Sequence, residues 1–333
     1  MPELGEVQHA ASLLKRFLLN RTVVKITSTP DEIVFVKPLI ASALDSLVGS
    51  RVTSVGRNGK YFWFECDSQK TLLMHFGMAG WIHVKDIRTH FIAMESGGDK
   101  KQKERIKEVL AAGGDPAALT IEKVPSEVWP PKYMKFVVET DQGDSIAFTD
   151  SRRLGRVRLF DMPASEACKV EPLSKLGRDY SQDPGDLASF SKDVSKRKVP
   201  IKALLLDQSV FSGIGNWMAD EIVFQARVHP EQYANTLDST QLETLYAKLL
   251  EVCEVSARLE GNTAGFPADW LMLHRWGKGR KAAQTLPSGH TVEHITVGGR
   301  TSCYVPELQV LTKVEEPVKD EPDVPSKKRR RKN

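Results

Sequence analysis

The sequence predicts an α+β protein in which an antiparallel β domain precedes a helical domain. Short runs rich in Val, Ile, Phe and Trp, separated by turn residues, fill much of residues 1–160. Helical periodicity takes over in residues 173–265, after a linker at 161–172 that contains two prolines. The chain has 333 residues, which is enough for two domains of ordinary size.

An amphipathic helix is predicted at the N-terminus. The apolar positions on its inner face, spaced with a period near 3.6, are Val7, Ala11, Leu14 and Leu18. Pro2 suits the first turn, because its missing N–H would have no partner there and its φ is preset. Glu3 and Glu6 fall on adjoining turns, where carboxylates complement the helix dipole. An ordinary helix start explains these residues as well.

The N-terminal amine is the first candidate for chemistry. Removal of Met1 would leave Pro2 with a free secondary amine, which is a strong nucleophile. The positive end of the helix dipole disfavours the protonated form. Because an α-amino group has a pKa of about 7.7–8.0, a small downward shift leaves much of it neutral near pH 7.

The β domain should be an antiparallel sheet or sandwich. Its predicted strands are residues 22–26, 33–37, 51–57, 61–66, 71–76, 81–84, 134–140, 145–149 and 156–160. Asn58-Gly59 suits a tight hairpin turn, with Lys60 directly after it. An insertion is expected at 86–131, helical around 101–111 and otherwise loop or disordered, because charge, glycine and proline dominate it.

Two loops of this domain contain residues that could bind a ligand. His75 ends an apolar run, and the glycines after it predict a loop that presents Met78 outward; a satisfied structural histidine is the alternative. The connection from Asp150 to Arg158 holds four arginines. Arginine offers planar donors for phosphates and base edges, although surface salt bridges would explain the cluster too.

The helical domain predicts an anion-binding turn. A helix at 199–207 is followed by a glycine-containing turn and by a second helix that begins at Trp217; a third helix spans 239–259. The backbone amides of the turn and the side chain of Asn216 can bind an anion. Farther on, residues 290–305 read as a β-hairpin with Gly298-Gly299 near its tip, which places Arg300 where it could reach a phosphate.

Composition narrows the function classes further. The net charge is +4, but residues 313–333 hold eight Lys/Arg and five Asp/Glu, so the folded part carries only about +1 and must bind nucleic acid through local clusters. No apolar run could span a membrane, and no secretory signal is visible. The four cysteines are far apart, which favours a reduced intracellular protein without a cysteine metal site.

The C-terminal residues 313–333 are expected to form a disordered tail. Acidic residues come first, and the basic cluster 327–332 follows them. This cluster is a candidate nuclear-localisation signal, with nonspecific nucleic-acid contact as the alternative.

Taken together and in order, these motifs resemble the formamidopyrimidine-DNA glycosylase (Fpg/Nei) family, over about residues 1–310. The segments that carry the resemblance are Met1-Pro2-Glu3-Leu4 with Glu6, Arg57-Asn58-Gly59-Lys60-Tyr61, His75-Phe76-Gly77-Met78, Asp150-Ser151-Arg152-Arg153, Gly213-Ile214-Gly215-Asn216, and Gly298-Gly299-Arg300 with Tyr304-Val305-Pro306-Glu307-Leu308. The last segment is similar to the zincless finger of the plant and fungal branch. The resemblance implies a catalytic β-sandwich domain at 1–160, a helix–two-turn–helix domain at 173–265, and a lesion loop and finger at 266–312.

The resemblance also implies a reaction and a set of site residues. Such enzymes flip an oxidised base out of duplex DNA, attack the sugar through an N-terminal proline and cut the strand by β- and δ-elimination. Pro2, Glu3 and Lys60 would be catalytic, and Glu6 would support the N-terminus. The residues implied to bind phosphates are His75, Asn216 and Arg300. The residues implied to fill the gap in the stack or to face the opposite base are Met78, Arg152 and Leu154. Damaged double-stranded DNA is the implied partner of a monomeric enzyme, with no cofactor and no metal.

The sequence departs from the family pattern at several positions. Gly5 replaces the usual proline, Leu154 stands where many members have phenylalanine, and the four zinc cysteines are absent. Two other functions stay open: a Nei-like enzyme that acts on oxidised pyrimidines, and a damaged-DNA-binding protein without catalysis. Intact Pro2, Glu3 and Lys60 favour an enzyme. The loop around 277–289, unlike its bacterial counterpart, favours formamidopyrimidines and hydantoins over 8-oxoguanine.

Overall fold

The computed structural model describes residues 2–89, 121–123, 125–126, 128–275 and 284–312. The predicted helix around 101–111 and the predicted tail at 313–333 lie outside these ranges.

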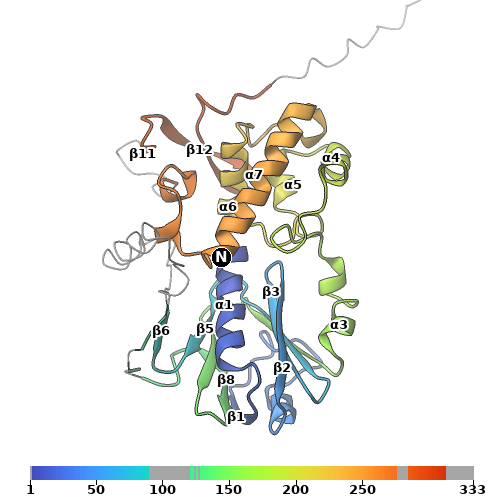
Figure 1. Ribbon diagram of the computed structural model, residues 1–333, viewed down its shortest axis with the longest axis vertical. Helices are drawn as coiled ribbons and strands as arrows, with labels where there is room; N and C mark the ends of the chain where they lie inside the picture. Colours follow the sequence, from blue (N-terminus) through green and yellow to red (C-terminus); the bar gives the residue numbers. More distant parts are fainter. Residues whose placement is uncertain (1, 90–120, 124, 127, 276–283, 313–333) are drawn as a thin grey trace, which may run out of the picture.

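The first domain consists of two antiparallel sheets packed face to face (Figure 1). The six-stranded sheet has the order β1 (Val23–Ser28), β8 (Met134–Thr140), β9 (Ser145–Asp150), β5 (Gly80–Val84), β6 (Ile87–Thr89) and β7 (Ile121–Lys123). The four-stranded sheet has the order β10 (Arg156–Phe160), β4 (Thr71–His75), β3 (Tyr61–Cys66) and β2 (Val52–Asn58). Buried Phe, Leu and Val side chains from both sheets form one core between them.

Three predictions for this domain need correction. Residues 33–37 form no strand, because the Asp31 carboxylate accepts hydrogen bonds from the amides of Ile33 and Val34 and so stabilises a turn. Within the hairpin of β2 and β3, Asn58 pairs with Tyr61, so the turn is Gly59-Lys60 and the lysine lies in it rather than after it. The ends of the predicted insertion form β6 and β7, which extend the larger sheet.

The second domain is a bundle of helices above the sandwich (Figure 1). Its helices are α4 (Leu187–Ser195), α5 (Ile201–Leu205), α6 (Asn216–Gln225) and α7 (Ser239–Arg258). The 3₁₀ turns of this domain are η3 (Leu173–Lys175), η4 (Ala234–Thr236), η5 (Thr263–Gly265) and η6 (Leu271–Leu273). The first domain contains the 3₁₀ turn η1 (Ala41–Leu47). The predicted linker contains a short helix, α3 (Ala164–Ala167). As predicted, a glycine-containing turn connects α5 to α6.

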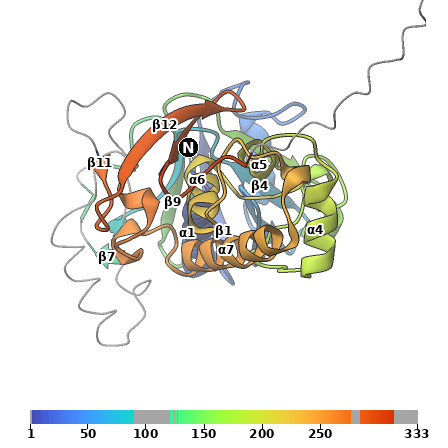
Figure 2. The same cartoon turned by 90° about the horizontal axis from the view of Figure 1, so that it is seen from above.

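The N-terminal helix α1 (Leu4–Phe17) joins the two domains. Leu4 packs in the core of the helical domain, whereas Val7 and the residues after it pack in the core of the sandwich. The helix contacts α7 as well as β2 and β3. Because α1 is shared by both cores, its first turn lies at the domain junction, where Glu3 contacts α6 (Figure 2).

A third, small sheet lies at the end of the helical domain. It consists of β11 (Gln284–Thr285), β12 (Thr291–Val297) and β13 (Arg300–Tyr304). Val297 pairs with Arg300, so Gly298-Gly299 is the hairpin tip, as the sequence predicts. Both glycines have positive φ values, 56° and 74°, which L-residues with side chains rarely adopt.

No helix in the described ranges is both long enough and apolar enough to cross a membrane.

Candidate active site at the domain junction

The side chain of Glu3 lies against the first turn of α6. Its two carboxylate oxygens accept hydrogen bonds from the amides of Trp217 and Met218, at 3.1 and 3.2 Å. These amides have no partner within their own helix, so a carboxylate from another domain satisfies them. A Cβ atom on Gly215 would lie 2.1 Å from the Glu3 Cδ atom, so only glycine leaves room for this contact.

The carboxyl groups of Glu3 and Glu6 are both buried and hold protons more strongly than usual. Burial raises the pKa of Glu3, although Lys60 and the helix amides partly oppose the rise. Burial and the nearby Glu3 raise the pKa of Glu6 to about 7. Glu6 accepts a hydrogen bond of 3.1 Å from the backbone amide of Glu3, which fixes the chain next to Pro2. The half-buried Pro2 therefore lies beside a carboxyl group that can give or take a proton near neutral pH.

Lys60 reaches the same place from the β2–β3 turn. Its side chain is 7 % exposed, and its Nζ donates a hydrogen bond of 2.8 Å to the carbonyl of Ile214. Burial lowers the pKa of Lys60, Glu3 opposes this, and Arg300 adds to it. Lys60, Glu3 and Arg300 therefore lie close enough to influence one another's charge.

A buried ion pair holds the turn that carries Lys60. Arg57 Nη1 lies 2.5 Å from Asp179 Oδ2, and the amide of Gly59 donates to the same oxygen at 2.8 Å. Ser181 and Gln182 add hydrogen bonds to the side chain and carbonyl of Arg57. Because residues 179–182 precede α4, this network connects the hairpin of the first domain to the second domain.

The glycines of the α5–α6 turn fit against both the N-terminus and the lysine turn. The amide of Leu4 donates to the carbonyl of Gly213 at 3.2 Å. A Cβ atom on Gly213 would lie 2.8 Å from the Leu4 side chain, and one on Gly59 would lie 1.9 Å from Ser212 Oγ. The α5–α6 turn can approach the N-terminal segment and the lysine turn this closely because Gly59, Gly213 and Gly215 carry no side chain.

His75 lies at the end of β4 and is neutral. Burial, followed by the charges of Lys60, Arg158 and Arg156, lowers its pKa to about 4. Its Nδ1 accepts a hydrogen bond of 3.1 Å from the amide of Gly77, so the ring proton belongs on Nε2, which can donate to a ligand. The ring packs against Tyr61, with 4.6 Å between the centroids.

Asn216 and the hairpin that carries Arg300 are in contact. Asn216 begins α6 and donates from Nδ2 to the carbonyl of Thr301 at 3.0 Å. Its Oδ1 is buried without a hydrogen-bond partner in the described part of the chain. Arg300 is exposed beside the hairpin tip. Asn216 therefore fixes the hairpin with its side-chain NH₂ group, a contact that the sequence does not reveal.

Two loops of the sandwich bring Met78, Arg152 and Leu154 to one surface. Gly77, with a φ of +60°, lies so close to the backbone of Leu154 that a Cβ atom would be 2.2 Å from its carbonyl oxygen. Met78 is half-buried, whereas Arg152 and Leu154 are exposed. Of the arginines predicted to bind a ligand, Arg153 instead forms a bidentate ion pair with the buried carboxylate of Asp31.

Sequence reasoning missed the residues that support this site from the second domain. Asp179 and Gln208 stand out in no motif, yet Asp179 binds the lysine turn and Gln208 Nε2 donates to the carbonyl of Ile214, as Lys60 does. The partner of Asp179 lies 120 positions away in the sequence, so no local spacing could have indicated it. Gln208 lies only six positions before Ile214, but no motif distinguishes it from the other polar residues of the turn. No group of His, Cys, Asp and Glu suited to a metal ion occurs in the described ranges.

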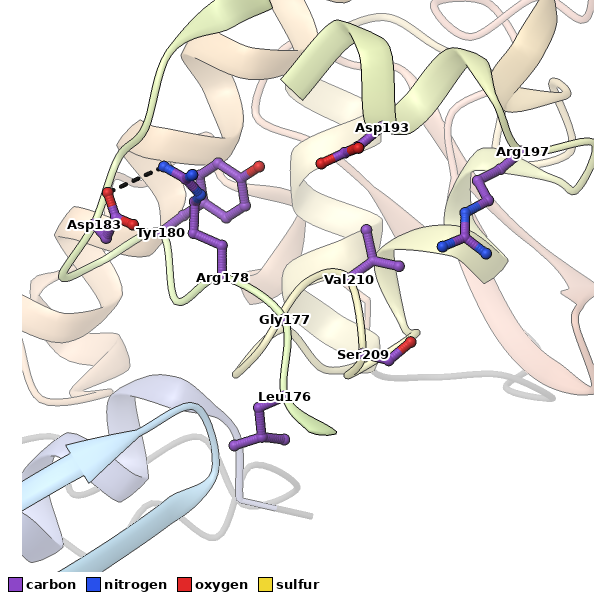
Figure 3. Close-up of a pocket in the computed structure, with 9 residues that line it drawn as sticks. All are labelled: Leu176, Gly177, Arg178, Tyr180, Asp183, Asp193, Arg197, Ser209 and Val210. Atoms are coloured by element: carbon purple, nitrogen blue, oxygen red, sulfur yellow. Dashed lines mark hydrogen bonds and ion pairs between the residues drawn. The ribbon is translucent and has the colours of Figure 1, made fainter. Parts of the chain in front are cut away.

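A polar cleft of about 490 Å³ opens elsewhere on the helical domain, between residues 176–183, α4 and the α5–α6 turn (Figure 3). Arg178 pairs there with Asp183, and Asp193 pairs with Lys196. None of the predicted site residues lines this cleft, so the junction around Glu3 and Lys60 is the candidate active site.

Two models of known protein families match this chain. Residues 1–157 match the family model of the formamidopyrimidine-DNA glycosylase N-terminal domain, and residues 176–267 match that of the formamidopyrimidine-DNA glycosylase H2TH domain. The solved structure of Lactococcus lactis Fpg in complex with DNA containing FAPY-dG aligns with a TM-score of 0.70 at 20 % identity, over 93 % of this chain and all of that one. This likeness shows the fold.

Similarity to curated relatives extends along nearly the whole chain. A formamidopyrimidine-DNA glycosylase of Desulfitobacterium hafniense is 26 % identical over 324 residues, which cover 93 % of this chain and 100 % of the relative. The enzyme of the same name from Arabidopsis thaliana is 36 % identical over 311 residues, 93 % of this chain and 71 % of the relative. With both family models matched in order, the chain belongs to the formamidopyrimidine-DNA glycosylase family.

Proposed function

We propose that this protein is a bifunctional DNA glycosylase and AP lyase of base excision repair, which removes oxidised purines from double-stranded DNA. The observation that carries the proposal is the position of Glu3, buried on the N-terminus of α6 beside Pro2 and within electrostatic reach of Lys60. The start of a helix does not require a buried carboxyl group, a buried lysine and an N-terminal proline to lie close together. Acid–base chemistry next to an amine does.

The first chemical step is attack by the amine. After removal of Met1, the Pro2 nitrogen donates its lone pair to C1′ of the flipped nucleotide, and the damaged base leaves with the electrons of the glycosidic bond. The proton that the Pro2 nitrogen then loses neutralises the departing base. Glu3, whose pKa is raised by burial, then donates a proton to the sugar ring oxygen. The ring opens, and an iminium ion between Pro2 and C1′ results.

The second step is elimination. The iminium ion acidifies the 2′ carbon, so loss of a proton there expels the 3′ phosphate, and a second elimination expels the 5′ phosphate. Lys60 serves as an acid or base in these eliminations, because its lowered pKa lets it exchange a proton more readily than a solvated lysine. Hydrolysis of the iminium ion finally releases Pro2.

Three side chains are proposed to bind phosphates around the flipped nucleotide. His75 offers a neutral Nε2 donor, and Arg300 offers a charged guanidinium beside the hairpin tip. Asn216 contributes through the first turn of α6 and through its hold on the hairpin. Met78, Arg152 and Leu154 lie on adjacent loops, from which they would fill the gap in the duplex and face the opposite base.

Excision assays on defined duplexes test this function. Formamidopyrimidine or hydantoin lesions should be removed faster than 8-oxoguanine opposite cytosine, and a thymine glycol duplex should be a poor substrate. Equal rates for 8-oxoguanine and formamidopyrimidine would overturn the lesion preference. A faster rate for the oxidised pyrimidine would favour the Nei-like function, and binding without excision would indicate a damaged-DNA reader.

We also propose that the enzyme is a monomer and acts in the nucleus. The basis for the nuclear location is the basic cluster at 327–332. A truncation that ends at Lys313 should lose nuclear accumulation in cells, and retention of the truncated protein in nuclei would remove this basis. Sedimentation of the protein with and without duplex DNA tests the monomer.

A further inference from the structure

Three charged side chains meet in the interior of the helical domain, behind the candidate active site. Asp220 of α6 lies between two cations: its Oδ1 is 2.5 Å from Lys202 Nζ, and its Oδ2 is 2.5 Å from Arg275 Nη2. The side chains of Lys202, Asp220 and Arg275 are 0 %, 1 % and 8 % exposed. Charges this deeply buried are costly unless they are paired, and Asp220 is the carboxylate that pairs both cations.

The cluster reaches the hairpin that carries Arg300. Lys202 Nζ donates a hydrogen bond of 3.1 Å to the carbonyl of Thr301, the same oxygen that accepts from Asn216 Nδ2 at 3.0 Å. The hairpin tip also rests on α5, because a Cβ atom on Gly298 would lie 3.0 Å from Ala203 Cβ. Arg300 directly precedes Thr301, whose carbonyl accepts these two hydrogen bonds.

The orientation of Lys202 depends on Asp220. A lysine ammonium on a flexible four-carbon stem can point in many directions. Here Asp220 holds the ammonium from the α6 side, so that its remaining protons face the hairpin. Arg275 occupies the other carboxylate oxygen and so limits rotation of the Asp220 side chain.

We propose that Asp220 is a positioning residue for phosphate binding: it fixes Lys202 on the Thr301 carbonyl and thereby sets the place of Arg300. This inference rests on the proposed function, in which Arg300 binds a phosphate beside the flipped nucleotide. Asp220 itself touches neither DNA nor the reacting atoms, and it acts through the hairpin.

A double-mutant cycle separates positioning from a general loss of stability. The dissociation constant for a duplex with a tetrahydrofuran abasic-site analogue is measured for the wild type, Arg300→Ala, Asp220→Asn and the double variant. Arg300→Ala should weaken binding about tenfold or more in the wild type, because it removes a charged hydrogen bond to a phosphate. In the Asp220→Asn background, the same substitution should weaken binding by less than about twofold, since a misplaced arginine has little left to lose.

Glu221→Gln is the matched control. Glu221 is the next residue of α6 and is also fully buried, but it accepts hydrogen bonds from the Met272 amide and Gln225 instead of supporting the hairpin. The Arg300→Ala effect should keep its wild-type size in this background. If Asp220→Asn does not fold, Lys202→Met replaces it. This variant leaves Asp220 paired with Arg275 and removes the ammonium that joins Asp220 to the Thr301 carbonyl.

The possible results separate the positioning role of Asp220 from the phosphate-binding role of Arg300. A full Arg300→Ala effect in the Asp220→Asn or Lys202→Met background would overturn the positioning role of Asp220 and leave the proposed function intact. An equally reduced effect in Glu221→Gln would also overturn it, because any damage to α6 would then suffice. If Arg300→Ala does not weaken binding in the wild type, the phosphate role of Arg300 falls, and the inference falls with it.

Discussion

Glu3 has two functions in one position, because its carboxyl group caps α6 and lies beside the proposed nucleophile. The amides of α6 favour its charged form, whereas burial favours the protonated form and dominates, so its pKa is raised. A carboxyl group whose pKa is raised holds a proton more readily than a solvated one, which suits it to serve as a general acid. The protonation of Glu3 is therefore set by the balance between its burial and its contacts with Lys60 and the amides of α6.

Glu3→Gln should separate the two activities. The amide keeps the size of the side chain but cannot deliver the proton that opens the sugar ring, so base excision should fall by about 100-fold or more. Incision at a preformed abasic site should fall much less, because the base is already gone and the aldehyde is accessible to the Pro2 amine. Single-turnover rates on lesion and abasic duplexes measure both, and an equal loss on the two substrates would contradict the role of Glu3.

His75 should impose a pH dependence on stability. Its pKa falls from about 6.5 in the unfolded chain to about 4 in the folded one, so the unfolded state binds more protons between these values. The free energy of unfolding should therefore decrease as pH falls from about 6.5 to 4, and His75→Gln should make this decrease shallower. Urea titrations at several pH values provide the measurement. Parallel pH profiles for the two proteins would show that the pKa of His75 is close to normal.

At the scale of elements, helices and turns that depend on residues close together in the chain could be predicted from the sequence. The periodicity of α1, the glycines at the β12–β13 tip and the third helix of the bundle all match the structure, because each depends on residues close together in the chain. The failures have local causes too: the Asp31 turn replaced a strand at 33–37, since a side-chain oxygen captured the amides that a strand would have offered to a neighbour.

The Arg57–Asp179 ion pair should control both stability and the place of Lys60. Asp179→Asn leaves a buried arginine without its counter-charge, so we expect a loss of roughly 3–5 kcal/mol in the free energy of unfolding. The control is Asp183→Asn, which breaks the exposed pair with Arg178 and should cost below about 1 kcal/mol. Chemical denaturation compares the variants.

The same pair of variants checks the effect on catalysis. Because the Gly59 amide also binds Asp179, Asp179→Asn should slow abasic-site incision under conditions in which the protein stays folded, whereas Asp183→Asn should not. Equal incision rates for the two folded variants would mean that Lys60 holds its position without Asp179.

At the scale of the whole molecule, the candidate active site exists only because two domains meet. α1 belongs to both cores, and the α5–α6 turn touches the N-terminus and the lysine turn at once. Residue patterns suggested Pro2, Glu3 and Asn216 separately, and the family resemblance added Lys60 and grouped the four. The contacts between Glu3 and α6, or between Lys202 and the Thr301 carbonyl of the hairpin, could not be predicted, because they join residues more than 50 positions apart and leave no periodic signal.

In the proposed reaction the amine of Pro2 forms a covalent bond with the sugar, which borohydride reduction would make permanent. The protein with a free Pro2 amine is incubated with an abasic or formamidopyrimidine duplex and reduced, and the linked peptide is identified by mass spectrometry. Pro2→Gly, Lys60→Ala and a protein with an N-terminal extension, which turns the amine into an amide, are the matched controls.

We expect a trapped complex with the DNA attached at Pro2. It should be much weaker in Pro2→Gly, absent with the extension, and still attached at Pro2 when Lys60 is replaced. Attachment at Lys60, or trapping that survives the extension, would contradict the amine mechanism. No trapped species despite retained duplex binding would make the protein a reader of damaged DNA rather than an enzyme.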